Sequence, residues 1–214
     1  MTTLLSKVKT LIEYAKFGMF ICKYHNSETG ELFFPRAINR YSVGHNAGYQ
    51  PYATKITGHL KTYGASSCLN ANKTVVEIDL PECINVTSNP WSEYGNSTLK
   101  VCKLPSLRQV YGATWKNFTA LEYLELGSLT NFFNGCLLGC EALTEFYIKE
   151  GTYSTLFLQY CPNLTQKSLH SIIENYADMI AVESPPLVWF GAENLAKIDK
   201  DHVELLEAKN INYK

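Results

Sequence analysis

An apolar pattern recurs four times along the middle of the chain and constrains the fold more than any other feature. Each copy carries apolar side chains at its first, fourth and sixth positions. The copies are Val75-Ile78-Leu80, Leu99-Cys102-Leu104, Leu121-Leu124-Leu126 and Leu143-Phe146-Ile148, and their starts at 75, 99, 121 and 143 are 24, 22 and 22 residues apart. A repeat of this length predicts one small structural unit per copy, stacked on its neighbours.

Two further columns follow the same period. The position three residues before each start is filled by Asn72, Asn96, Phe118, Cys140 and Cys161, the last of these belonging to a fifth copy that starts at Leu164. The column after each strand contains Ile84, Leu107 and Leu129, which we expect in the core. The strand pattern fails in the fifth copy, where Lys167 occupies the next apolar position. The alternative is an antiparallel sheet whose strands are evenly spaced.

One copy provides a short strand and a return segment, which together are too small to bury their own apolar face. Stacking the copies predicts an α/β fold in which a parallel sheet lines one side of a solenoid. Because side chains alternate between the two faces of a strand, the residues between the apolar positions point outward. These outward residues form the predicted binding surface, which comprises Asp79, Lys103, Tyr123, Glu125, Glu145 and Tyr147. Among them, Asp79, Lys103 and Glu125 predict a ladder of alternating charge across neighbouring strands.

The flanking segments differ in pattern from the repeats in residues 73–163. Residues 1–45 predict a helix over 2–17 and a β-hairpin over 18–43, whose turn is NSETG. The apolar seam of the helix predicts self-association through Leu5, Val8, Ile12 and Ala15, or else packing of an amphipathic helix on its own domain. Residues 46–72 predict an irregular connection or a degenerate first repeat, with Ile56 and Leu60 in the core.

Residues 164–214 predict a unit that closes the open end of the core. Thr165 is a favourable N-cap for a helix over 165–179, and Asp199 is one for a final helix. A short strand is expected over 187–190 between them. Repeat proteins need such a terminal unit, because the last repeat otherwise exposes its apolar face to water.

Several motifs resemble the BspA-like class of leucine-rich repeats found in proteins of gut bacteria and their phages. They are FTALEYLEL at 118–126, GCEALTEFYI at 139–148 and YCPNL at 160–164, and the resemblance extends over residues 72–214. The resemblance implies a leucine-rich-repeat solenoid that binds partners or has a structural role, and that is not an enzyme. The leading hypothesis is a phage virion component, associated with the tail or head, whose partners are other virion proteins, itself, or a host-surface protein or glycan. The alternatives are a bacterial surface adhesin or carbohydrate-binding module and, in third place, an enzyme.

Composition and motifs limit the remaining functions. The formal net charge of −1 predicts no binding to nucleic acid, and no apolar run approaches the roughly 20 residues that span a bilayer. The N-terminus lacks the pattern of a signal peptide, so export by the standard secretory route is not expected. The five His are too far apart in sequence to predict a metal pair, and we predict no catalytic residue and no cofactor. The seven Cys are expected to be reduced and buried, and Trp115 is expected in the core.

Overall fold

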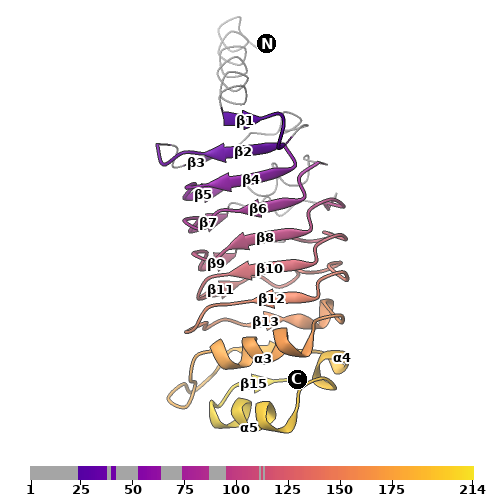
Figure 1. The fold of residues 1–214 in the computed structure, drawn as a ribbon. Coiled ribbons are helices and arrows are strands. Elements are labelled where there is room, and N and C mark those ends of the chain that lie inside the picture. Colours follow the sequence, from indigo (N-terminus) through magenta and orange to yellow (C-terminus); the bar gives the residue numbers. More distant parts are fainter. Residues whose placement is uncertain are drawn as a thin grey trace, which may run out of the picture.

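The computed structural model describes residues 24–37, 40–41, 53–63, 74–86, 95–110, 112 and 114–214. Within these ranges the chain is an α/β protein with one mixed sheet, two parallel sheets and three α-helices, and no sheet closes into a barrel. Figure 1 shows the strands lying one above another, with α3 and α5 at the C-terminal end. The predicted helix over residues 2–17, and with it Leu5, Val8, Ile12 and Ala15, lies outside the described residues.

The largest sheet has seven strands in the order β1-β2-β4-β6-β8-β10-β12. The strands are β1 (His25–Asn26), β2 (Glu31–Phe34), β4 (Lys55–Gly58), β6 (Glu77–Asp79), β8 (Val101–Leu104), β10 (Tyr123–Leu126) and β12 (Glu145–Tyr147). Strand β1 is antiparallel to β2, and all other neighbours are parallel. Cys102 pairs with Ile78 on one side and with Leu124 on the other, and Leu124 pairs with Phe146. The register expected from the repeat is therefore confirmed, and the antiparallel alternative is wrong for these four strands.

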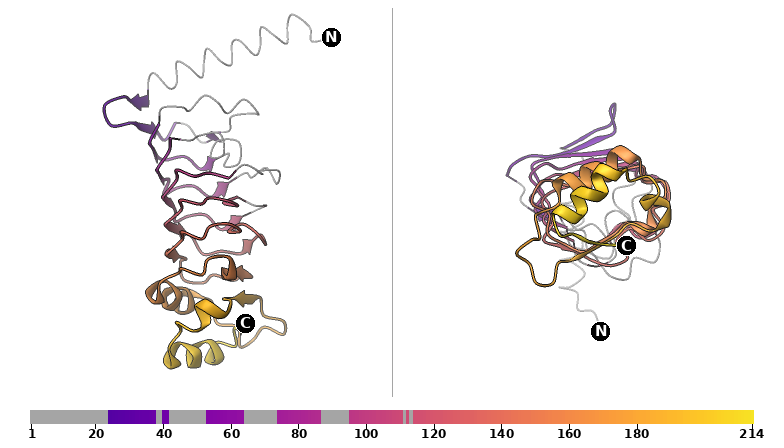
Figure 2. Two further views of the ribbon diagram at one scale, coloured as in Figure 1. Left: turned by 90° about the vertical axis from the view of Figure 1, so that its right-hand side faces the viewer. Right: turned by 90° about the horizontal axis from the view of Figure 1, so that it is seen from below.

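A second sheet of five short parallel strands follows the order β11-β9-β7-β5-β3. Its strands are β3 (Arg40–Tyr41), β5 (Thr62–Tyr63), β7 (Asn85–Val86), β9 (Gln109–Val110) and β11 (Asn131–Phe132). Each follows one strand of the large sheet in the chain, so the two sheets advance together (Figures 1 and 2).

The core lies between the two sheets and is filled by the apolar positions of the repeat. Val75, Leu99, Leu121 and Leu143 are all fully buried, as are the template residues that follow them in each strand. Trp115 is buried too, which confirms its predicted place. Trp91, Tyr94 and Tyr111 lie outside the described residues.

One predicted core position is wrong by a single residue. Ile84 is 56% exposed, whereas its neighbour Cys83 is fully buried beside Leu107 and Leu129 in the column. The backbone explains the difference, because the Cys83 N–H donates to Leu80 O, as the Leu107 N–H donates to Leu104 O. This turn has the same length in both repeats, so the thiol and not the isoleucine takes the inward position.

The hairpin expected near the N-terminus is present in its described part, where His25 pairs with Leu32 and Asn26 with Glu31. Its second strand, β2, also pairs with β4 and so belongs to the large sheet. Ile56 of β4 and Leu60 are fully buried, as expected. The segment 53–63 therefore contributes one strand to each of the two main sheets.

The C-terminal unit contains all three helices of the described residues and a third sheet in the order β13-β14-β15. Its elements are β13 (Leu156–Phe157), the 3-10 helix η1 (Leu158–Tyr160), α3 (Gln166–Asn175), β14 (Leu187–Trp189), α4 (Ala192–Leu195), α5 (Lys200–Ala208) and β15 (Asn212–Tyr213). Viewed along the stack, α3 and α5 lie across its end (Figure 2). Among the helices described, none combines the length and apolar character needed to cross a membrane.

Both predicted N-caps are confirmed. The Thr165 side chain accepts a hydrogen bond from the Ser168 N–H, and the Asp199 side chain accepts one from the His202 N–H. Helix α3 ends at Asn175, four residues before its predicted end at 179. Tyr176 has extended dihedral angles and forms a parallel bridge with Thr152, so pairing with the preceding turn replaces a further turn of helix.

Candidate functional site

The predicted binding surface is assembled on the outer face of the large sheet. Register places Asp79 beside Lys103, Lys103 beside Glu125, and Glu125 beside Tyr147. The neighbouring column places Tyr123 beside Glu145. All six side chains are partly exposed, since their positions alternate with the buried template residues.

Two tyrosines form the centre of this surface. The rings of Tyr123 and Tyr147 lie with their centroids 5.6 Å apart and their planes inclined at 47°. The Tyr123 hydroxyl donates to Glu125 Oε2 at 3.1 Å, and the Tyr147 hydroxyl donates to Glu145 Oε2 at 2.8 Å. Partial burial raises the pKa of each phenol to about 12, and the adjacent carboxylates add to the effect. Both phenols therefore remain protonated at neutral pH.

Lysine ammonium groups lie over both rings. Lys103 Nζ is 5.7 Å from the centroid of Tyr123, and Lys167 Nζ is 5.9 Å from that of Tyr147. Both distances are within the range of a cation–π interaction. The surface thus combines aromatic faces, carboxylates and ammonium groups, which suits contacts with sugars and with proteins.

The expected charge ladder exists as a sequence of neighbours but not as ion pairs. No ion pair within 4.0 Å joins Asp79 to Lys103 or Lys103 to Glu125, which are all described residues. Among the described residues, Lys55 pairs with Glu77 at 3.1 Å and Lys100 pairs with Glu122 at 2.9 Å. Lys103 lies over an aromatic ring instead, a partner that sequence alone did not indicate.

An open hollow adjoins the surface where the sheet meets α3. It is lined by Tyr147, Gln166, Lys167, His170, Ser171, Glu174 and Asp199. Tyr147 is the one lining residue that belongs to the predicted surface. The others come from the C-terminal unit, for which the sequence predicts only a capping role.

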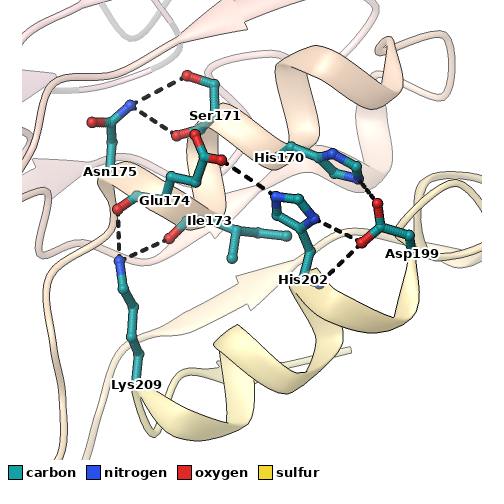
Figure 3. Close-up of polar contacts among 8 residues, drawn as sticks. All are labelled: His170, Ser171, Ile173, Glu174, Asn175, Asp199, His202 and Lys209. Atoms are coloured by element: carbon teal, nitrogen blue, oxygen red, sulfur yellow. Dashed lines mark hydrogen bonds and ion pairs between the residues drawn. The ribbon is translucent and has the colours of Figure 1, made fainter.

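A cluster of ionisable side chains borders this hollow and joins α3 to α5 (Figure 3). The imidazole rings of His170 and His202 stack with centroids 3.5 Å apart and planes inclined at 14°. Asp199 contacts both rings, with Oδ1 2.7 Å from His202 Nδ1 and Oδ2 3.4 Å from His170 Nε2. The second nitrogen of His202, Nε2, lies 3.4 Å from Glu174 Oε1. Within the described residues, His170, Asp199 and His202 form the group whose donor atoms are close enough to hold a metal ion.

The electrostatics of the cluster favour an ion pair between protonated His202 and ionised Asp199. Partial burial of His202 opposes its protonation, but hydrogen bonds to Asp199 and Glu174 outweigh it and raise its pKa above the ordinary value. The hydrogen bond from His202 lowers the pKa of Asp199. Sequence reasoning missed this cluster, because His170 and His202 are 32 residues apart and meet only when the two helices pack.

The described thiols do not contribute to either site. Cys102, Cys140 and Cys161 occupy inward repeat positions, as predicted, and Cys83 and Cys136 are buried with them. All five are free, and burial raises their pKa, to about 12 for Cys102, Cys136 and Cys140. These thiols act as small apolar groups in the core.

The comparisons with known proteins returned no match to a family model, to a curated protein or to a solved structure.

Proposed function

We propose that this protein is a leucine-rich-repeat solenoid of the BspA-like class and a non-catalytic recognition protein. Its outer sheet face binds a protein or glycan partner. The period near 22 residues, the in-register stacking of Ile78, Cys102, Leu124 and Phe146, and the second row of short strands support this interpretation.

The observation that carries the proposal is the arrangement of Tyr123 and Tyr147. The two rings lie side by side on a regular sheet, and each hydroxyl is held by a carboxylate from its own strand. Rigid aromatic side chains provide large contact areas at low entropic cost, and they dominate many recognition surfaces. The neighbouring lysines and carboxylates supply hydrogen-bonding groups for a polar partner.

The sequence resemblance supports a place in a phage virion, with other virion proteins or copies of the chain as partners. The alternative is the surface of a bacterial cell, where the same face would bind a host protein or glycan. Immunodetection on purified phage particles and on intact cells distinguishes the two locations.

Binding to a glycan array and to immobilised candidate proteins tests the recognition surface. We expect Tyr123→Ala and Tyr147→Ala each to weaken binding by about tenfold or more, because each removes a central aromatic contact. Tyr153→Ala is the matched control, since Tyr153 is an exposed tyrosine that lies outside this face. Binding that survives both substitutions on the face, or that is lost equally with Tyr153→Ala, contradicts the proposed surface.

A further inference from the structure

The contact between α3 and α5 carries an inference that is independent of the recognition surface. We propose that His170, Asp199 and His202 form a binding site for a divalent transition-metal ion of the zinc type, which links the two helices of the C-terminal unit.

The residue types match the preferences of such an ion. Zinc is bound in proteins by imidazole nitrogen and carboxylate oxygen, and sites with three protein ligands leave a position for water. Here two imidazoles and one carboxylate meet from two different helices. His170 and Asp199 also line the open hollow, which gives an ion and its water a route to the site.

The distances between the donor atoms fit one ion. Ligands at about 2.1 Å from a tetrahedral ion lie about 3.4 Å from one another. His170 Nε2 and Asp199 Oδ2 are 3.4 Å apart, and the donor atoms of all three residues lie within 4.8 Å of one another. His170 Nε2 is buried and has no aligned hydrogen-bond partner, although Asp199 is near it. This nitrogen is therefore available as a metal ligand, because among the described residues it has no partner other than Asp199.

Asp199 can serve the ion without giving up its structural role. Its Oδ1 accepts from the His202 N–H at 3.0 Å and caps α5, while Oδ2 faces His170. Oδ1 also lies 2.7 Å from His202 Nδ1, so an ion bound by Oδ2, His170 Nε2 and His202 Nδ1 replaces that contact and leaves the backbone cap of α5 in place.

Glu174 supplies the supporting contact that metal-binding histidines usually have. Its Oε1 lies 3.4 Å from His202 Nε2, on the side of the ring away from Asp199. A histidine that binds metal through one nitrogen commonly donates its other N–H to a carboxylate, which fixes the ring and increases its basicity. His202 has this arrangement, with Nδ1 facing Asp199 and Nε2 facing Glu174 (Figure 3).

Binding of the ion requires a rotation of the stacked imidazole rings of His170 and His202. The two ring planes are inclined at only 14°, so the nitrogen lone pairs, which lie in those planes, do not converge on one point. The ring edges that face Asp199 must tilt toward each other for both lone pairs to reach one ion. Both side chains are 17% exposed, and the hollow beside His170 leaves space for this rotation.

Calorimetric titration of Zn²⁺ into the chelator-treated 214-residue chain tests the site. We expect one ion per chain, and a loss of affinity of about tenfold or more in His170→Gln and in His202→Gln. Glu174→Gln removes the supporting carboxylate and is expected to weaken binding by about tenfold. His59→Gln is the matched control, because His59 also contacts a carboxylate, that of Glu82, at the other end of the stack.

Two further measurements keep the test decisive. Asn is also a good N-cap, so Asp199→Asn should remain folded in chelator, with its unfolding temperature lowered only by the loss of the ionic contacts to the two histidines, while losing Zn²⁺ affinity. Replacement of Zn²⁺ by Co²⁺ should give visible d–d bands without the intense near-ultraviolet charge-transfer band that thiolate ligands produce. The proposal is overturned if the protein takes up no Zn²⁺, if both histidine variants bind as tightly as the wild type, or if the Co²⁺ spectrum shows thiolate ligands.

Discussion

The seven-stranded sheet ends differently at its two edges. At the first end, β2 pairs with the two-residue strand β1 of its own hairpin. At the other end, β12 meets a helix, α3, in place of a further strand. The Ser168 hydroxyl accepts from the Phe146 N–H and donates to the Phe146 carbonyl, both at 2.8 Å. The Ser168 side chain thus satisfies both backbone groups of Phe146, which would otherwise pair with a further strand.

This difference shows how a parallel stack can end without leaving a strand edge open. An unpaired edge is a template for association with another chain, and covering it with a helix is one way to prevent this. At the C-terminal end the helix also has fixed partners, because Lys209 Nζ donates to the carbonyls of Ile173, Glu174 and Tyr176 at the end of α3. Substitutions at individual residues of this closure test how much each contributes to the free energy of unfolding.

The largest loss in the free energy of unfolding is expected for Phe146→Ala. This side chain is fully buried beneath α3 and stacks on Phe132 at 6.1 Å. Truncation should lower the free energy of unfolding by about 3–5 kcal/mol, as for other buried aromatics. The matched change at the first end is Phe33→Ala, whose side chain is 42% exposed and should cost much less. Denaturant unfolding measures both, and equal losses would contradict the described burial.

A smaller loss is expected for Ser168→Ala. The substitution leaves the buried N–H and carbonyl of Phe146 without their partner, which costs about 1–3 kcal/mol. Ser171→Ala in the same helix is the control, since its hydroxyl accepts only from the partly exposed side chain of Asn175. If both variants unfold at the same denaturant concentration as the wild type, the hydroxyl does not close the edge.

The smallest effect concerns thiol reactivity and leaves stability unchanged. Burial raises the pKa of Cys83, in the half nearer β1, to about 11, and that of Cys140, nearer α3, to about 12. The thiolate reacts, so at pH 8 both Cys83 and Cys140 should be alkylated far more slowly in the native protein than in the unfolded one. Iodoacetamide labelling of the native and of the unfolded protein followed by peptide mass spectrometry measures each rate. Faster labelling of Cys140 would indicate that the C-terminal half opens first.

Much of the main fold follows from the spacing of apolar residues. The positions of Ile78, Cys102 and Leu124 predict their register, because a parallel strand must bury the same face in every repeat. The failure of this pattern at Lys167 marks where the seven-stranded sheet gains no further strand and α3 begins. Ile84 and Cys83 show that the more apolar of two adjacent residues is not always the one that the turn directs inward.

The sites depend on contacts that periodicity does not encode. The outward columns, with Tyr123 and Tyr147, could be predicted from alternation along the strands, but the lysines over their rings could not. His170 and His202 offered no signal at all, because each is an isolated histidine on its own helix. Their meeting depends on the angle and depth at which α5 packs against α3.

By itself, the sequence determined the repeat, its register, the residues on each face of the sheet and the two helix caps. These properties depend on local backbone geometry and on burying one apolar face, which a short pattern can specify. Only the tertiary structure decided that a serine hydroxyl closes the sheet and that two distant histidines stack around one aspartate. Such contacts join residues whose separation in the chain carries no period, so they are set by packing alone.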